Sequence, residues 1–451
     1  MGVVIETDVW EPNQALYIFI LVSCFLLIFC LPRLSTGLNR TPTLFDQSVS
    51  SSFVRFQRSF LLTYAISSVL EGLWPVFGEY EFSHYGVAKG HMVLYLCVGY
   101  AAALFVGTFS GMLSDIIGQK KVCLIFCILH LFVGVWKRIS QHPSIWLASV
   151  CLFLASSIFS FSFEAWMVVQ HNKQGHRQDT LNDMFWLMTF TESASTIVSQ
   201  VLANWLVDSN VKRSAIFPST AAVVLAILSF IFVSQVSREV PQTAAVRDYR
   251  ASFNAYIFGD KRVCLLIWAQ ACVHFSNSII WIIWAPTIVA DGREVQLGLI
   301  YPCLLGARML GSTAFPWFFS GPLFLRTEDC LEYVFIVMGL ILSIVAYDYQ
   351  EIGVLVALFC LFHACVGLIL PSLARLRTMY IPNQLRGGMI SLSLAPANAA
   401  VLLFLFQRGY YQNIENSTVI AIAALGLFSA AGCLHLLKRW GKQPHQNWQK
   451  L

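Results

Sequence analysis

Four charged side chains fall inside long apolar runs of the sequence, where a charge needs a physical reason. They are Glu71, Glu164, Glu192 and Arg308. A charged group at the centre of a bilayer costs roughly 2.5–3.5 kcal/mol on insertion scales, so such residues usually serve binding or proton movement. A carboxyl group can take up and release a proton, and a guanidinium group can bind an anion. These four residues are the first candidates for both kinds of chemistry.

A polar stripe within another apolar run adds to this set. Gln270, His274, Asn277 and Trp281 are spaced i, i+4, i+7 and i+11, which places them on one face of a helix. In a membrane helix this face should turn away from lipid, either to line a cavity or to hydrogen-bond to a neighbouring helix. Trp74 lies one turn from Glu71, where it can form a cavity wall or simply pack.

The elements that must position these residues are membrane helices. The chain has 451 residues, of which 57% are hydrophobic and 12% charged, whereas soluble proteins have about 45–50% apolar and about 25% charged residues. Thirteen apolar runs approach the roughly 20 residues that span a bilayer. They are 15–31, 60–78, 92–113, 122–139, 144–170, 184–207, 214–235, 263–290, 297–320, 331–347, 352–374, 387–407 and 417–437. We therefore predict an all-α, multi-pass membrane protein.

The flanking charges predict its orientation. Arg33 and Arg40 follow the first run and acidic residues precede it, the reverse of a cleaved signal peptide. Lysine and arginine concentrate in alternate loops, which the positive-inside rule assigns to the cytoplasm. We expect a protein of the cell membrane with its N-terminus outside and its C-terminus cytoplasmic. Asn416 is then a glycosylation candidate, whereas Asn39, in a similar sequon, would face the cytoplasm.

The twelve runs after the first divide into two sets of six, which indicates an internal repeat. The longest internal polar stretch separates the sets and has the composition of a solvated linker. The expected organisation is an anchor helix with a cytoplasmic linker over 1–59, a six-helix bundle over 60–235, a linker over 236–262, a six-helix bundle over 263–439 and a cytoplasmic tail over 440–451.

Depth along the helices groups the polar residues. At about 1.5 Å of rise per residue, Glu71 and Arg308 lie about 16 Å into their runs, near the middle of a hydrocarbon core about 30 Å thick. Glu164 and Glu192 fall nearer the cytoplasmic side, at about 10 Å and about 12 Å, where an inner gate or a proton exit would lie. Three glutamates against one arginine predict a net negative interior. Three more polar residues lie at the middle level: His274, His363 and Asn398.

The loop after the second helix of the first half reads GMLSDIIGQKK. It resembles the signature of the major facilitator superfamily, in which this loop acts as a conformational latch. Gly118 permits a tight turn, and Asp115 can face a helix N-terminus, whose free N–H groups carry partial positive charge. Gln119 stands where the family often has a basic residue. The latch candidates are Gly111, Asp115, Gly118, Lys120 and Lys121.

Three further segments resemble the molybdate-anion transporter branch of this superfamily, in its plant-like form. They are FVRFQRSF at 53–60, SFEAW at 162–166 and WAPT at 284–287. The resemblance runs from about residue 53 to residue 439 and implies the major facilitator fold, two six-helix bundles, here with one extra N-terminal transmembrane helix. It also implies secondary active uptake of molybdate by alternating access.

This resemblance suggests a coupling mechanism. A neutral, protonated glutamic acid is physically reasonable in the interior, because burial raises the pKa of a glutamate. Our hypothesis is proton-coupled uptake, in which Arg308 and a charged His274 hold the oxyanion while Glu71 or Glu164 carries the proton.

The same residues allow other functions. Acidic and aromatic spans would also fit a cationic or neutral organic substrate, and a non-transporting receptor can keep a carrier fold. No GxSxG, HExxH or P-loop sequence supports an enzyme. No cysteine has metal-type spacing with histidine, so neither a metal nor a cofactor is expected. The scattered basic residues argue against nucleic acid, which leaves the lipid bilayer, the oxyanion and protons as expected partners.

Overall fold

A computed structural model describes residues 9–37, 51–84, 89–139, 144–176, 178–208, 216–236, 246–290, 293–319, 326–347, 351–410 and 415–441. Within these ranges the regular structure is helical, apart from one isolated bridge between Trp10 and Val295. The prediction of an all-α protein is confirmed.

Helix α1 is followed by the helices of the first half. The π-helical turn η1 joins α3 and α4 into one interrupted span, so that α2 to α8 provide six spans. The bounds are α1 (Gln14–Gly37), α2 (Ser51–His84), α3 (Lys89–Ala102), η1 (Ala103–Gly107), α4 (Thr108–Ile117), α5 (Gln119–Ile139), α6 (Ile145–Lys173), α7 (Gln178–Asp208) and α8 (Ile216–Gln235).

The second half follows a short helix, α9, which lies within the expected linker. Its six spans are α10 to α15, and a 3-10 turn, η3, precedes α14. The bounds are α9 (Val246–Gly259), α10 (Lys261–Ile288), α11 (Leu297–Phe319), α12 (Thr327–Tyr347), α13 (Ile352–Tyr380), η3 (Asn383–Leu385), α14 (Arg386–Tyr410) and α15 (Asn416–Gly441).

The structure differs from the expected organisation at two polar segments. Helix α2 begins at Ser51, so the segment 53–60 belongs to the first span and not to a linker. The stretch 236–262 is not solvated throughout, because Tyr249 and Phe253 of α9 are buried against the hydrophobic core of the second half. Aromatic residues within a charged stretch give a short helix one apolar face that can pack.

Length and composition make most of these helices membrane spans. Among the described residues, 8 helices are long and apolar enough to cross a membrane, and shorter apolar helices cover Gln14–Ile28 and Ser219–Gln235. Helices α2, α7 and α11 are not among the 8. These are the helices that carry Glu71, Glu192 and Arg308, whereas Glu164 lies on α6, which is among the 8.

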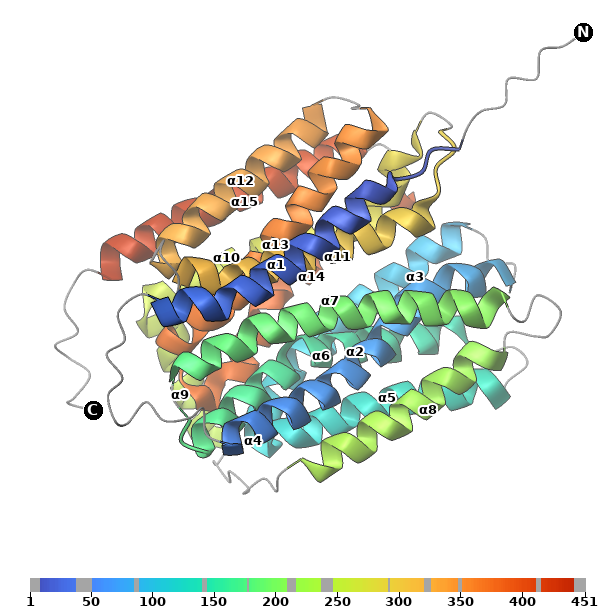
Figure 1. Cartoon of the computed structure of the whole chain (residues 1–451). Helices are drawn as coiled ribbons and strands as arrows, with labels where there is room; N and C mark the ends of the chain where they lie inside the picture. The colour runs from blue at the N-terminus through green and yellow to red at the C-terminus, as the bar shows by residue number, and fades with distance from the viewer. Residues whose placement is uncertain are drawn as a thin grey trace, which may run out of the picture.

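The helices pack as two bundles, which Figure 1 shows as α2 to α8, coloured blue to green, beside α10 to α15, coloured yellow to red, with α1 in dark blue lying on the second group. Each bundle has its own hydrophobic core, around Phe126 and Trp166 in the first and around Phe335 and Phe359 in the second. The halves meet where α3 and α4 pack against α14 and where α7 packs against α11 and α13. Helix α1 lies against α11 of the second half. The contacts between the halves described below come from these interface helices, from α6 and α10 beside them, and from α9.

Candidate functional site

Asp115, at the end of α4, lies at the N-terminus of α14 in the other half. Its Oδ1 accepts a hydrogen bond from the Gly387 backbone N–H (3.0 Å) and its Oδ2 accepts one from the Gly388 N–H (2.7 Å). The first N–H groups of a helix have no partner within the helix and carry partial positive charge. The carboxylate therefore satisfies two of these donors and joins the halves at the end of the bundle that carries α9, here called the linker end.

Small residues make this approach possible. A Cβ atom at Gly387 would lie 2.8 Å from the Asp115 Oδ1 atom, closer than packed atoms allow. Gly118 ends α4 with φ 106°, a left-handed conformation that glycine adopts without strain. Gly111 lies against Ser391 and the Gly387 carbonyl, with no room for a side chain. Of the latch candidates, these two glycines and Asp115 build the contact.

Tyr249 of the linker helix α9 completes the environment of Asp115. Its hydroxyl donates to Asp115 Oδ2 at 3.0 Å. Burial and the neighbouring Asp115 carboxylate raise the pKa of Tyr249 well above its usual range, so the hydroxyl stays protonated and remains a donor. Because α9 lies between the two bundles in the sequence, this bond fastens the linker onto the junction of the halves.

The two lysines of the motif have other positions. Lys120 Nζ donates to the carbonyl oxygens of Ser234 (2.8 Å) and Val236 (2.7 Å), at the carboxyl end of α8. A cation there is favourable because the last carbonyl groups of a helix carry partial negative charge. Lys121 is exposed. Lys120 therefore stabilises the packing of the first half.

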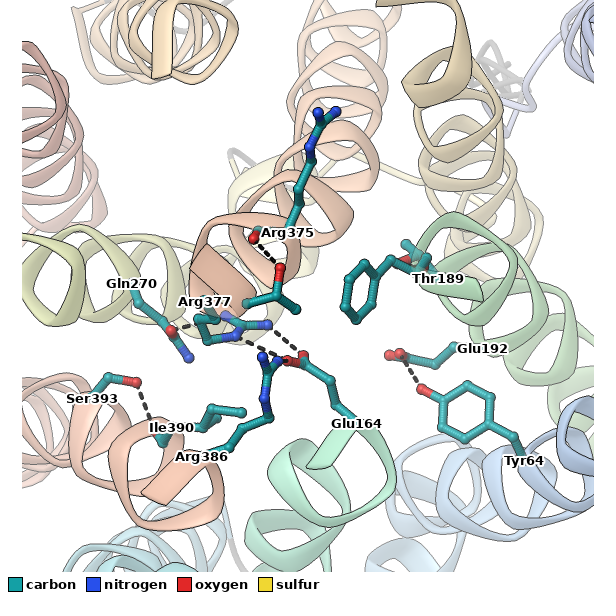
Figure 2. Close-up of polar contacts among 12 residues, drawn as sticks. Tyr64, Glu164, Thr189, Glu192, Gln270, Arg375, Arg377, Arg386, Ile390 and Ser393 are labelled. Carbon is teal, nitrogen blue, oxygen red and sulfur yellow. Dashed lines mark hydrogen bonds and ion pairs between the residues drawn. The ribbon is translucent and has the colours of Figure 1, made fainter. Parts of the chain in front are cut away.

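A second contact between the halves is centred on Glu164 of α6 (Figure 2). The Arg377 side chain of α13 donates to both carboxylate oxygens, through Nε to Oε1 at 3.0 Å and through Nη2 to Oε2. Arg386, the first residue of α14, donates from Nη1 to Oε1 at 3.1 Å. Gln270 of α10 accepts from Arg377 Nη1 at 2.9 Å. One acidic residue of the first half thus meets two arginines of the second.

Burial makes this cluster a high-energy arrangement. Arg386 is 0% exposed and Arg377 is 5% exposed. The Nε and Nη2 atoms of Arg386 have no hydrogen-bond partner in the described part of the chain. A buried donor without a partner costs roughly 1–3 kcal/mol, and more when it is charged. Two positive donors of Arg386 are therefore available to an acceptor.

A third contact joins the halves through Glu192 of α7. Arg308 Nη2 of α11 donates to Glu192 Oε1 at 2.8 Å, and the Tyr64 hydroxyl of α2 donates to Oε2 at 2.9 Å. The Arg308 Nε atom is buried and makes no hydrogen bond to any described residue. The Glu192 side chain keeps 28% of its surface exposed, which shows that the space beside this pair is not fully packed.

The stripe on α10 faces the same interior. Gln270 binds Arg377, and His274 lies one turn farther along the same face of α10. Farther along the helix, the Trp281 ring packs on His363 of α13 with ring centroids 4.6 Å apart. Neither ring nitrogen of His363 has a partner among the described residues.

Other candidates lie outside these clusters. Glu71 pairs with His130 Nε2 of α5 at 3.0 Å, within the first half. Lys137 Nζ lies 4.2 Å from the centre of the Trp74 ring. Both contacts belong to the packing of the first bundle.

Three polar candidates remain. Asn277 carries a buried Oδ1 without a partner in the described ranges, and Asn398 is half-buried on α14. Asn416 Oδ1 accepts from Arg408 Nη1 at 2.7 Å. Asn39 lies outside the described residues.

The chain matches a known protein family over most of its length. A family model described as sugar transporters, 12 TM, matches residues 28–373, a range that reaches into both sets of helices. The chain belongs to the major facilitator superfamily.

Its relatives in this superfamily include molybdate-anion transporters. The one from Xenopus tropicalis is 26% identical over 405 residues, which cover 85% of this chain and 86% of that protein. The one from Danio rerio is 25% identical over 376 residues, 75% of this chain and 76% of that protein. These proteins and the superfamily are transporters, so the chain is a transporter and not an enzyme.

Solved structures share the fold. The major facilitator transporter FucP in its outward conformation superposes with a TM-score of 0.63 at 13% identity, covering 84% of this chain and 99% of FucP. A bacterial homologue of ferroportin in an outward-facing state gives 0.65 at 14% identity, covering 86% and 100%. The predicted major facilitator fold is confirmed.

The transporter's arginine cluster is not predicted from the sequence. Arg377 and Arg386 lie just outside the apolar runs, where hydropathy assigns them to loops. The helices α13 and α14 extend beyond those runs and bury both side chains. The expectation of a net negative interior is therefore wrong, because three arginines, Arg308, Arg377 and Arg386, pair with Glu164 and Glu192, while Glu71 pairs with His130. A basic residue directly before a glycine pair, Arg386-Gly387-Gly388, is the signal that could have shown it.

Proposed function

We propose that this protein is a secondary active transporter that carries molybdate across the membrane by alternating access. The observation that supports it most is the set of buried arginines on the second half, which face acidic residues of the first half and keep donors without partners among the described residues. Relatives at 25–26% identity over most of the chain that are named molybdate-anion transporters support the same substrate.

The donors fit an oxyanion. Molybdate is a divalent tetrahedral anion whose oxygens accept hydrogen bonds, and a guanidinium group presents planar, paired N–H donors to such acceptors. Arg386 offers Nε and Nη2, and Arg308 offers Nε. His274, one turn from Gln270 on the same face of α10, is a further candidate donor. A bound dianion would satisfy donors that the described part of the chain leaves unsatisfied.

Glu164 and Glu192 provide a way to release the bound anion. Glu164 and Glu192 occupy arginine donors that the substrate needs, so an anion and these carboxylates compete for the same groups. When the anion displaces a carboxylate, the halves lose an ion pair that joins them, which frees them to separate. This competition links substrate binding to the movement of the bundles.

Protons balance the charge. A carboxylate displaced from an arginine in a low-dielectric interior favours its neutral form. One proton on Glu164 and one on Glu192 would offset the two charges of molybdate. We therefore propose proton-coupled uptake that is electroneutral, so that its rate changes with pH but not with membrane voltage.

The proposed setting is the cell membrane, with the linker end facing the cytoplasm. The support is the concentration of lysine and arginine in alternate loops. In this orientation, the contacts of Asp115 and Glu164 close the cytoplasmic side. An epitope tag at the N-terminus should be accessible to antibody on intact cells, and a tag at the C-terminus only after permeabilisation; the reverse result would invert the orientation.

Counterflow of labelled molybdate into proteoliposomes tests the proposal. We expect exchange that tungstate and sulfate inhibit and that an inward proton gradient accelerates. Binding without counterflow would favour a receptor. Inhibition by organic cations or sugars, with none by oxyanions, would favour the organic-solute alternative and overturn the oxyanion site.

A further inference from the structure

Helix α11, which carries Arg308, is built from weak helix formers. Between its start and Arg308 it contains Gly298, Pro302 and Gly306. Glycine and proline are the two least favourable residues in a helix interior. Proline also has no backbone N–H, so Pro302 leaves the carbonyl of Gly298 without its donor within the helix. This segment depends on neighbours for its shape.

Two interface helices provide part of that support. Gln200 of α7 donates from Nε2 to the released Gly298 carbonyl at 2.7 Å. Helix α13 lies so close that a Cβ atom at Gly367 would collide with the Arg308 carbonyl oxygen. Together these contacts hold α11 on the sides that face the interior of the protein.

The N-terminal segment supports α11 along the outside. Trp10 N–H donates to the Glu294 carbonyl (3.0 Å), and Gln296 N–H donates to the Trp10 carbonyl (3.2 Å). The Tyr17 hydroxyl donates to the Leu299 carbonyl at 2.5 Å.

One turn farther along α1, Ile20 is 9% exposed. Its Cγ2 atom lies 3.0 Å from the position of a Cβ atom at Gly306, so Ile20 fills the space that this glycine leaves. Helix α1 therefore follows the weak part of α11 from residues 294–296 to residue 306, and Figure 1 shows α1 lying along the second bundle.

These contacts lie on the face of α11 opposite Arg308. Leu299 and Gly306 are seven residues apart and share a face. Arg308 comes two residues later, about 200° around the helix at about 100° per residue. Helix α1 thus does not reach the interior and acts on Arg308 only through the backbone of α11. The other face of α1 is open, with Ile18 and Phe19 each 62% exposed.

We propose that α1 stabilises the conformation of α11 from the outside, and that Tyr17 and Ile20 are positioning residues for Arg308. They hold the segment around Pro302 in one shape, so that the guanidinium group stays at the depth and angle needed to bind the anion. The inference rests on the proposed function, because it takes Arg308 as a substrate-binding group.

The first test compares variants on the two faces of α1. The double variant Tyr17→Phe with Ile20→Ala should raise the KM for molybdate about three- to ten-fold while Vmax changes less than two-fold, since a loss of about one hydrogen bond and one packing contact acts on binding. Phe19→Ala, of similar or greater size change on the exposed face, should leave KM unchanged. An unchanged KM in the double variant, or an equal rise in Phe19→Ala, overturns the proposal.

The second test does not depend on molybdate. Amide hydrogen exchange of the purified full chain should be at least ten-fold faster over residues 299–308 in the double variant than in the wild type or in Phe19→Ala. Unchanged exchange overturns the proposal that α1 stabilises α11. If exchange rises as expected while the wild-type protein shows no molybdate counterflow, the stabilisation of α11 by α1 is confirmed and the proposed function fails.

Discussion

The two halves of the bundle share one architecture but face each other with opposite charges. The first half contributes carboxylates to the interface: Asp115, Glu164 and Glu192. The second half contributes the cations and helix N–H groups that bind them: Arg308, Arg377, Arg386, Gly387 and Gly388. The two six-helix bundles thus share a fold but carry interface groups of opposite charge.

The difference indicates how an anion is handled. In the proposed mechanism the arginines of the second half bind the anion, and the carboxylates of the first half take its place when it leaves. A polar interior that is internally paired avoids the cost of unpaired buried charges, which is several kcal/mol per ion. Substitutions that change one side of this complementarity should therefore have distinct effects.

The largest effect is expected from the cationic side. Arg386→Gln removes a fully buried donor set, and hydrogen bonds to charged groups contribute about 1.5–3 kcal/mol. We expect molybdate uptake at low concentration to fall about 10- to 100-fold, measured as initial rates normalised to surface expression.

Arg375→Gln is the matched control for this experiment. Arg375 lies on α13 two residues before Arg377 and points away from Glu164 in Figure 2. Its replacement should change uptake less than two-fold. Similar losses of uptake in both variants would show that uptake depends only on the total positive charge at this end of the bundle. They would contradict a specific role for Arg386.

The acidic side should respond in the opposite direction. Glu164→Gln removes the carboxylate that competes with the substrate, so we expect a lower KM, by about ten-fold, together with a lower Vmax because release is impaired. The dependence of the rate on pH should become flatter. Glu332→Gln, in a pair with His435 away from the interface, serves as the control. A raised KM in Glu164→Gln would contradict competition.

The Asp115 contact gives a smaller effect, on conformation and not on binding. Asp115→Asn keeps the size of the side chain but loses the charge that faces two helix N–H groups. We expect a loss of stability of about 1–2 kcal/mol and a Vmax reduced several-fold, with KM nearly unchanged. Ser114→Ala, the buried neighbour, should change neither. Thermal unfolding and uptake, measured in parallel, separate the two outcomes.

The smallest effect belongs to the linker. Tyr249→Phe removes one hydrogen bond to Asp115 and should cost about 1 kcal/mol. The raised pKa of Tyr249 means that its stabilising proton is fully present below the unfolded pKa of about 10 and is lost only above it. The stability difference between wild type and variant should therefore stay constant from about pH 8 to about pH 9 and fall only at higher pH. A difference that disappears between about pH 8 and about pH 9 would contradict a neutral donor.

The fold was predictable because long apolar runs specify membrane helices directly. The residues of the site were predictable only where a charge lay inside a run, as with Glu164 and Arg308. Arg377 and Arg386 lay beyond the run ends, and burial of a helix terminus depends on what packs on it, which hydropathy does not report. Glu71 shows the converse: depth placed it centrally, but its direction around the helix leads to His130. The assignment of molybdate as the substrate rests on the relatives, since proteins of one fold transport many different solutes.

The π-turn η1 sets the register of the span that ends at Asp115. Such a turn accommodates an additional residue in a helix, and each residue rotates the remainder of the helix by about 100°. Deleting one residue from Ala103–Gly107 would leave a regular α-helix that directs Asp115 almost as before, whereas inserting one more residue would rotate α4 by about 100° and turn Asp115 away from α14. The π-turn thus lets this span hold one additional residue without losing the contact between the two halves of the transporter.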